Sequence, residues 1–213
     1  MDIILFGMQG SGKGTQGKIL AEKYGLTVFD MGSQLRSMIE SGSELGVKIK
    51  SIVESGNLVD DDTVLEVIEN FLSKVPADKS VLFDGIPRTL KQSEGLLKLL
   101  EAKKRQTFAL LVKISEKEAI KRLTERRVCS SCKEIYPAFF DGNICSACGG
   151  ELITRQDDSN LDAIKQRLEN YQNETTPVIN QFYNIDRLIE VDGEQAIPDV
   201  TEEMIDKAGY LFS

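Results

Sequence analysis

A glycine-rich loop directly follows the first apolar run of the chain. The run covers residues 3–6, and the loop reads Gly7-Met8-Gln9-Gly10-Ser11-Gly12-Lys13-Gly14-Thr15. A buried strand, a glycine loop and the start of a helix together surround a phosphate with backbone N–H groups and one lysine. Glycines permit the backbone angles that such a loop needs. The feature predicts an α/β fold with a phosphate-binding loop whose ligand is a nucleoside triphosphate with Mg²⁺.

The loop departs from the usual pattern, and a second glycine pattern overlaps it. The usual pattern is G-x-x-x-x-G-K-[ST], whereas here Gly14 follows Lys13 and the hydroxyl arrives one residue later, as Thr15. Residues 12–17 also read G-x-G-x-x-G, a dinucleotide fingerprint, with Asp30 downstream. A dinucleotide site would not explain Lys13 or the second anion site described below. We therefore favour the triphosphate interpretation over a dinucleotide site or a turn without function.

Composition narrows the class of protein. The length of 213 residues with 41% apolar residues suits one compact catalytic core with small insertions. The net charge of −8 argues against nucleic acid or an anionic membrane as a partner, because both favour a basic surface. No apolar stretch approaches the roughly 18 residues of a membrane span, so we expect a soluble, cytoplasmic protein. Histidine is absent, which removes the commonest general base but is compatible with phosphoryl transfer.

Short apolar runs alternate with helical patterns along the chain, as in a parallel sheet with crossover helices. Strands are expected at residues 2–6, 26–29, 81–84, 108–114 and 188–191. Helices are expected at residues 13–23, 61–72, 90–101, 116–127 and 161–183. The segments 30–59 and 128–158 break the alternation, so we expect them to be insertions at the carboxyl edge of the sheet.

A second chemical site begins where the apolar run 81–83 ends in Asp84-Gly85-Ile86-Pro87-Arg88-Thr89. A strand beside the phosphate loop of such proteins commonly delivers an aspartate to Mg²⁺ or its water shell. Gly85 and Pro87 favour a tight turn from which Arg88 projects. The alternative is a surface turn with a solvated arginine, which the neighbouring phosphate loop disfavours.

All four cysteines lie in two C-x-x-C pairs. Cys129 and Cys132 are followed, after 12 intervening residues, by Cys145 and Cys148. This spacing can bring four thiolates around one tetrahedral Zn²⁺, and a cytosolic setting disfavours disulfides. The metal would be structural because no coordination position stays open. A disulfide, free thiols or iron are the alternatives.

Seven blocks of sequence together resemble the adenylate kinases, within the nucleoside monophosphate kinases, over essentially the whole chain. The blocks are Gly12-Lys13-Gly14-Thr15, Leu35-Arg36, Ser41-Gly42-Ser43-Glu44-Leu45-Gly46, Gly56-Asn57-Leu58-Val59, Asp84-Gly85-Ile86-Pro87-Arg88-Thr89 with Gln92, Arg126-Arg127, and Thr154-Arg155-Gln156-Asp157-Asp158.

The resemblance implies a P-loop NTPase three-layer fold with a central five-stranded parallel sheet. The core would comprise residues 1–29, 60–125 and 159–213, with a helical monophosphate-binding insertion at 30–59 and a zinc-stapled lid at 126–158. The implied reaction is reversible phosphoryl transfer from ATP-Mg to AMP, giving two ADP, by a monomeric enzyme.

The resemblance also assigns roles by position. The implied catalytic residues are Lys13, Asp84, Arg88, Arg126, Arg155 and Arg167. The implied ATP-binding residues are Gly10, Ser11, Gly12, Lys13, Gly14, Thr15, Arg122, Arg126, Ile135, Tyr136 and Gln195. The implied AMP-binding residues are Met31, Arg36, Asn57, Leu58, Val59, Gly85, Ile86, Pro87, Arg88, Gln92, Arg155 and Arg167.

Some of these roles are more specific. Arg36 and Arg88 would hold the phosphate of the monophosphate, and Gln92 would contact the edge of its base. Arg122 would lie against the adenine of ATP. Asp157 and Asp158 are expected to help latch the closed lid.

Met31 departs from the family pattern, which usually has a threonine at this position. Methionine cannot donate the hydroxyl hydrogen bond that threonine makes near the AMP base, so the departure bears on base selectivity. One alternative is therefore a kinase of the same fold that prefers CMP, UMP or GMP. A more distant alternative is a nucleotide-sensing zinc-ribbon binding module, although the segment between the cysteines is not basic. Gln9 and Ile86 replace the family's usual proline and phenylalanine, and both are acceptable on packing grounds.

Overall fold

A computed structural model describes residues 1–137, 140–154, 158 and 160–212. Five parallel strands form the central sheet in the order β2-β3-β1-β4-β8. The strands are β1 (Asp2–Phe6), β2 (Thr27–Asp30), β3 (Val81–Asp84), β4 (Thr107–Lys113) and β8 (Leu188–Asp192). The predicted parallel sheet is confirmed, and every strand bound lies within one residue of its expected position.

Helices cover both faces of this sheet, because alternate residues of each strand point to opposite faces. Ile4 and Phe6 of β1 lie in one apolar cluster, while Ile3 and Leu5 lie in another. The first cluster includes residues of α4 (Asp61–Leu72), α5 (Leu90–Ala102) and α8 (Thr176–Asn184). The second includes residues of α1 (Lys13–Tyr24) and α9 (Ile197–Ala208). Within the described parts of the chain, none of the helices is long and apolar enough to cross a membrane.

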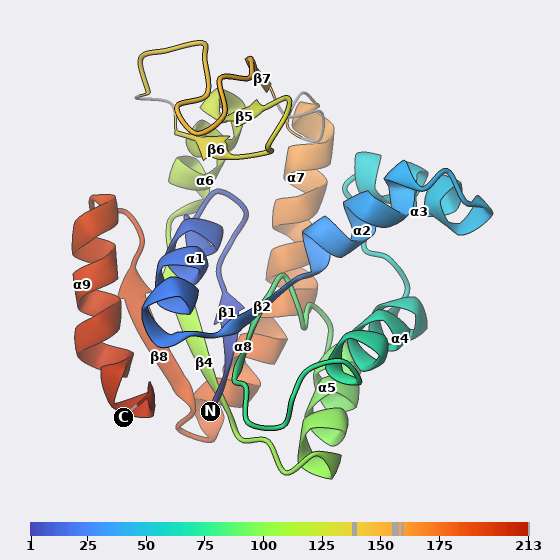
Figure 1. Ribbon diagram of the computed structural model, residues 1–213, viewed down its shortest axis with the longest axis vertical. Coiled ribbons are helices and arrows are strands. Elements are labelled where there is room, and N and C mark those ends of the chain that lie inside the picture. Colours follow the sequence, from blue (N-terminus) through green and yellow to red (C-terminus); the bar gives the residue numbers. More distant parts are fainter. Residues whose placement is uncertain (138–139, 155–157, 159, 213) are drawn as a thin grey trace.

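Two further units lie at one end of the sheet (Figure 1). One consists of α2 (Met31–Glu40) and α3 (Glu44–Glu54), which follow β2 directly. The other is a small antiparallel sheet in the order β6-β5-β7. Its strands are β5 (Arg127–Cys129), β6 (Ile135–Tyr136) and β7 (Leu152–Thr154). Helices α6 (Glu116–Glu125) and α7 (Leu161–Asn170) lead into and out of this unit and pack together through Ala119, Leu123, Ile164 and Leu168.

Two helix predictions need correction, and one helix was missed. The helix expected at 116–127 ends at Glu125, because Arg126 is extended (φ −69°, ψ 135°) and Arg127 begins β5. The helix expected at 161–183 is α7 and α8 with a five-residue π-helix, Tyr171–Thr175, between them. Helix α9, followed by the 3-10 turn Gly209–Phe212, was not predicted, although Pro198 in its first turn is a start signal.

Candidate active site

The phosphate loop joins β1 to α1. Gly12 caps the helix with φ 89°, a left-handed conformation that a residue with a side chain rarely adopts. The backbone N–H of Ser11 donates to the carbonyl of Met8 at 3.1 Å, which closes the loop as a turn. The first turn of α1 carries no acidic side chain and no side-chain cap. Its N–H groups and helix dipole therefore offer an anion site.

Lys13 and Asp84 lie together at this loop. Asp84 ends β3 opposite Leu5 of β1, and a Cβ added to Gly14 would lie 3.5 Å from Asp84 Oδ2. Burial lowers the pKa of the Lys13 ammonium and raises the pKa of the Asp84 carboxyl, and the attraction between the two charges opposes both shifts. Asp84 Oδ1 is buried and has no hydrogen-bond partner. An unpartnered carboxylate oxygen beside a phosphate loop fits Mg²⁺ or its water shell.

The turn after β3 holds Arg88 firmly. Its Nε donates to the carbonyl of Gly85 at 2.9 Å, and its backbone N–H donates to Gln92 Oε1 at 2.7 Å. Gln92 Nε2 donates in turn to Asp61 Oδ1 at 3.0 Å. The Thr175 hydroxyl donates to the backbone carbonyl of Arg88 at 3.1 Å. Gln92 is therefore buried with both ends of its amide engaged by the protein, and its predicted contact with a base edge remains a prediction.

Arg36 lies at the start of the α2–α3 unit. One guanidinium nitrogen, NH2, donates to Ser33 Oγ at 2.8 Å and lies 3.4 Å from Asp30 Oδ2. The Ser33 hydroxyl donates to the same Asp30 oxygen at 2.5 Å. Asp30 ends β2 and pairs in register with Asp84 of β3. Arg36 and Asp84 are therefore brought to the same edge of the sheet.

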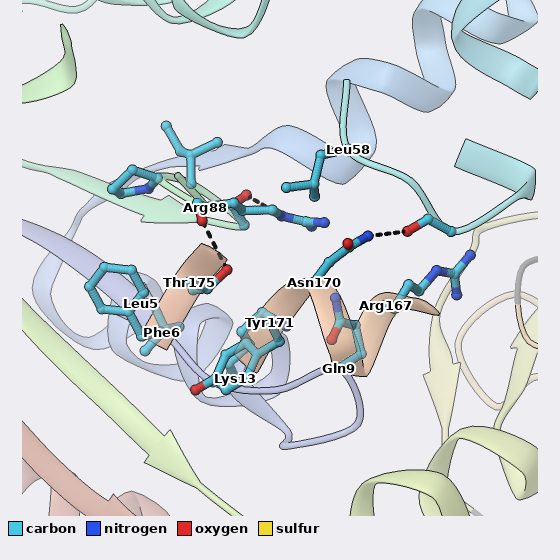
Figure 2. Close-up of a pocket in the computed structure, with 15 residues that line it drawn as sticks. Leu5, Phe6, Gln9, Lys13, Leu58, Arg88, Arg167, Asn170, Tyr171 and Thr175 are labelled. Carbon is cyan, nitrogen blue, oxygen red and sulfur yellow. Dashed lines mark hydrogen bonds between the residues drawn. The ribbon is translucent and has the colours of Figure 1, made fainter. Parts of the chain in front are cut away.

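An open pocket lies between the phosphate loop, the Arg88 turn and α7 (Figure 2). Among the predicted residues, it is lined by Lys13, Leu58, Gly85, Ile86, Pro87, Arg88 and Arg167. Three side chains of cationic type from distant parts of the chain, Lys13, Arg88 and Arg167, thus converge on one cavity. Met31 and Val59 instead lie buried in the main apolar cluster. The predicted residues Arg36, Asn57, Gln92 and Arg126 do not line this pocket.

Asp158 ties the antiparallel unit to α7. Its side chain is fully buried and lies 2.6 Å from Arg126 NH2 and 3.3 Å from Arg167 NH1. Arg167 NH2 also donates to the carbonyl of Val53 in α3 at 3.4 Å. This network joins three segments of the chain through one carboxylate. Arg155 and Asp157, which were predicted to act nearby, lie outside the described residues.

The residues predicted to hold ATP fall into two groups outside the loop. Arg122 donates to the carbonyl of Gly193 at 2.9 Å and to Glu118 at 2.7 Å. Gln195, two residues after Gly193, donates to Glu203 at 2.6 Å. The structure thus brings the Arg122 and Gln195 segments together. Ile135 is half exposed in the antiparallel unit, whereas Tyr136 is buried there.

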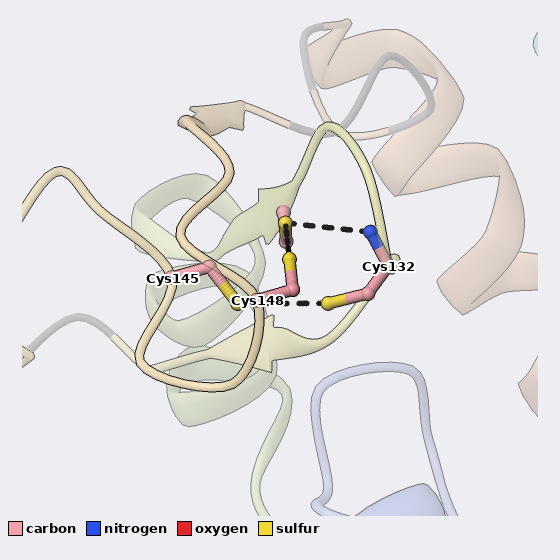
Figure 3. Close-up of side chains that lie close together, drawn as sticks. Cys132, Cys145 and Cys148 are labelled. Atoms are coloured by element: carbon pink, nitrogen blue, oxygen red, sulfur yellow. Dashed lines mark hydrogen bonds between the residues drawn. The ribbon is translucent and has the colours of Figure 1, made fainter.

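The four cysteines form one cluster (Figure 3). Their Sγ atoms all lie within 4.8 Å of one another, with Cys129 to Cys148 at 3.4 Å and Cys132 to Cys145 at 3.5 Å. Zn–S bonds of about 2.3 Å place tetrahedral sulfurs about 3.8 Å apart, which these distances bracket. All four cysteines are free, which disagrees with the disulfide alternative. The Tyr136 hydroxyl donates to Cys145 Sγ at 3.2 Å and lowers the pKa of that thiol to about 6, which favours the thiolate that a metal needs.

A family model described as adenylate kinase matches residues 5–187. This chain belongs to the adenylate kinase family. Proteins named adenylate kinase are similar to it along nearly their whole length. That of Magnetococcus marinus is 38% identical over 210 residues, covering 96% of this chain and 98% of the relative. That of Methanocella arvoryzae is 37% identical over 209 residues (96% and 96%), and that of Clostridium tetani 35% over 216 residues (99% and 100%).

Four polar or aromatic side chains line the pocket of this adenylate kinase family member without having been predicted, namely Gln9, Asn170, Tyr171 and Thr175. Asn170 Nδ2 donates to the carbonyl of Gly56 at 3.0 Å, which ties α7 to the end of the α2–α3 unit. Gly56 has φ 80°, and a Cβ there would come within 2.5 Å of the Ala163 carbonyl. Residues 167, 170 and 171 lie in one predicted helix, and residues three and four apart are neighbours on the surface of a helix. This spacing could have revealed that the three side chains share one face.

Proposed function

We propose that this chain catalyses reversible transfer of a phosphoryl group from ATP-Mg to AMP, giving two ADP. The convergence of Lys13, Arg88 and Arg167 on one pocket beside the phosphate loop carries this proposal. Such an arrangement suits two negatively charged substrates that must approach each other end to end. Membership of the adenylate kinase family supports the choice of substrates.

In the proposed mechanism the loop and Lys13 hold the phosphates of ATP, while Arg36 and Arg88 hold the phosphate of AMP through guanidinium contacts. Arg126, Arg155 and Arg167 neutralise charge that develops during transfer. Phosphoryl transfer asks for positioning and charge neutralisation, so the absence of histidine is no obstacle. Asp84 is the residue that would hold Mg²⁺ or its waters, and the ion would supply positive charge that neutralises the phosphates.

The remaining proposed roles concern the binding of the two nucleotides. On the ATP side they involve Gly10, Ser11, Gly12, Gly14, Thr15, Arg122, Ile135, Tyr136 and Gln195. On the AMP side they involve Met31, Asn57, Leu58, Val59, Gly85, Ile86, Pro87 and Gln92. Arg122 and Gln195 come from segments that meet at Gly193, which supports a shared nucleoside site. Leu58, Gly85, Ile86 and Pro87 line the pocket together.

We divide the chain into a core (residues 1–29, 60–125 and 159–213), a monophosphate-binding insertion (30–59) and a lid (126–158). The lid would be stapled by structural Zn²⁺ on Cys129, Cys132, Cys145 and Cys148, which supplies folding free energy that a small segment cannot gain from apolar burial. Closure of the lid would exclude water, which could otherwise accept the phosphoryl group. We propose that the enzyme acts as a cytoplasmic monomer.

One observation keeps a second substrate choice open. Met31 is only 2% exposed, and its Cβ lies 3.7 Å from where a Cβ of Gly85 would be, beside the Arg88 turn. An apolar side chain there offers no hydrogen bond to a base. A preference for CMP, UMP or GMP is therefore the alternative to AMP.

The decisive experiment measures ADP formation from ATP-Mg with AMP, CMP, UMP and GMP in parallel, with Lys13→Ala as the blank. Turnover with AMP is expected to exceed turnover with the other three monophosphates. Preference for another monophosphate would show that Met31 has changed the base selectivity. Absence of turnover with every monophosphate would refute the proposal, provided that the parent chain is folded, as a cooperative melting transition shows.

A further inference from the structure

Gln9 is a polar side chain of the phosphate loop to which the proposed function gives no role. It stands four residues before Lys13, in the middle of the loop. Its Oε1 atom is buried without a hydrogen-bond partner. Buried polar side-chain atoms nearly always have a partner, so an exception inside an active-site loop calls for an explanation. Only two other such side-chain atoms occur in the described residues, and one of them belongs to Asp84, which the phosphate loop also approaches through Gly14.

The loop directs Gln9 into the pocket. The neighbouring side chain, Met8, packs against the cluster that joins α6 and α7. Gly10 lies so close to α6 that an added Cβ would be 3.1 Å from the Ala119 carbonyl. The residues on both sides of Gln9 are thus anchored to the protein, whereas Gln9 lines the cavity together with Lys13, Arg88 and Arg167. In Figure 2 its side chain lies between Tyr171 and Arg167.

An amide suits this place chemically. Its NH₂ group donates hydrogen bonds and its carbonyl oxygen accepts them, so one side chain can contact a phosphoryl oxygen and a guanidinium N–H at once. It is neutral at every pH of interest, so it does not repel the phosphates. Because the residues on both sides of Gln9 are anchored, the backbone that carries the amide is held in place before substrate arrives, which suits electrostatic catalysis.

We propose that Gln9 is a further catalytic residue that contacts the phosphoryl group in transit. Its Nε2 donates to an oxygen of that group, and its Oε1 accepts from a guanidinium N–H of Arg167. In the transfer, the bond between phosphorus and the leaving oxygen of ADP breaks while a bond to a phosphate oxygen of AMP forms. Gln9 neither gives nor takes a proton in this step.

Because this role presupposes the proposed phosphoryl transfer, the test compares three variants with the active parent chain. Gln9→Ala removes the amide, and Gln9→Glu keeps its shape but presents a carboxylate to the phosphates. Gln181→Ala, at an exposed position of α8, is the matched control. We measure kcat, the KM values for ATP and AMP, and the melting temperature of each.

For Gln9→Ala we expect kcat to fall about 10- to 100-fold, because the variant loses one hydrogen bond to a charged group. Both KM values should stay within about threefold of those of the parent chain. The kcat of Gln9→Glu should fall further, because this variant keeps the shape of the side chain but replaces the N–H donor with a negatively charged oxygen. A Gln9→Ala kcat within twofold of the parent, or a loss confined to KM, would overturn the catalytic role, as would a Gln9→Glu variant as active as the parent. If the parent chain itself forms no ADP, the proposed function fails, and this role fails with it.

Discussion

The α2–α3 unit and the antiparallel unit lie at the same end of the central sheet (Figure 1) but are stabilised in different ways. Met31, Ile49 and Val59 of residues 30–59 are buried in the large apolar cluster that also covers the central sheet. The antiparallel unit has a separate small cluster of Cys129, Tyr136, Cys145 and Leu152, with Phe140 packed against it. Two of its four buried members are cysteines of the proposed metal site.

The difference shows how a protein can stabilise a segment that projects from its core. A unit that shares the main core gains stability from apolar burial, and it unfolds only together with that core. A unit that extends away from the core has too few apolar side chains of its own, so four thiolates and a metal take their place. The antiparallel unit should therefore lose its structure independently of the sheet.

The largest expected effect comes from removing the cysteine cluster. In Cys129→Ser with Cys145→Ser, we expect bound zinc to fall from one atom per chain to none and the antiparallel unit to unfold. The core should remain folded, while kcat should fall on the order of 10³, because the cationic groups of the lid are misplaced. Elemental analysis, hydrogen exchange of β5 and β1, and kcat measure these three outcomes. Retained protection of β5 amides in the metal-free variant would contradict the comparison.

A pair of large-to-small substitutions tests the two units directly. Ile49→Ala, in the shared core, should lower the free energy of global unfolding by about 4 kcal/mol, since it leaves a cavity at a site only 1% exposed. Leu152→Ala, at a comparably buried site of the antiparallel unit, should leave the global transition almost unchanged. Denaturant unfolding of both variants with zinc present makes the comparison. Equal shifts in the two variants would mean that the two units share one cooperative core.

Asp158 tests the connection between the units. Asp158→Asn should cost about 3 kcal/mol of unfolding free energy, because a buried carboxylate that faces two arginines loses its charge. Asp206→Asn, at an exposed position of α9, is the matched control and should have little effect. Thermal unfolding measures both variants. A Tm for Asp158→Asn equal to that of the control would show that the network does not stabilise the fold.

The smallest effect is expected for the ion pair between α1 and the antiparallel unit. Lys18 Nζ lies 3.1 Å from Glu134, but both side chains are well exposed (61% and 43%). Screening by water limits such a pair to about 0.5 kcal/mol. The kcat of Lys18→Ala should thus differ from that of the parent by less than about twofold, and this difference should disappear in high salt. A larger change that persists in high salt would show that the pair holds the antiparallel unit against α1.

The regular elements could be predicted because their signals are local. Apolar runs of four to seven residues mark the strands, and apolar residues at helical spacing mark the helices between them. The phosphate loop and the paired cysteines are also contiguous patterns. These features depend on residues within a few positions of each other, so sequence alone reveals them.

The connections between elements could not be predicted in the same way. Asp158 meets Arg126 across 32 residues, and Asn170 meets Gly56 across 114. The family resemblance gave Asp158 an expected role in the lid but did not give its partner, and nothing in the local pattern of Asn170 distinguishes it from a solvated polar side chain. The engaged amide of Gln92 is a similar case, because its partner Asp61 lies 31 residues away. Such pairings exist only once the sheet has fixed the positions of distant segments.

The number of residues in the π-helix Tyr171–Thr175 affects the geometry of the site. A π turn closes its hydrogen bond over five residues instead of four, so it accommodates one extra residue without breaking the helix. That extra residue rotates everything after it relative to Arg167 and thereby sets where Thr175 meets the Arg88 turn. Shortening the segment by a single residue would shift α8 by a fraction of a turn, moving Thr175 out of phase with Arg167 while leaving the remaining side chains chemically unchanged.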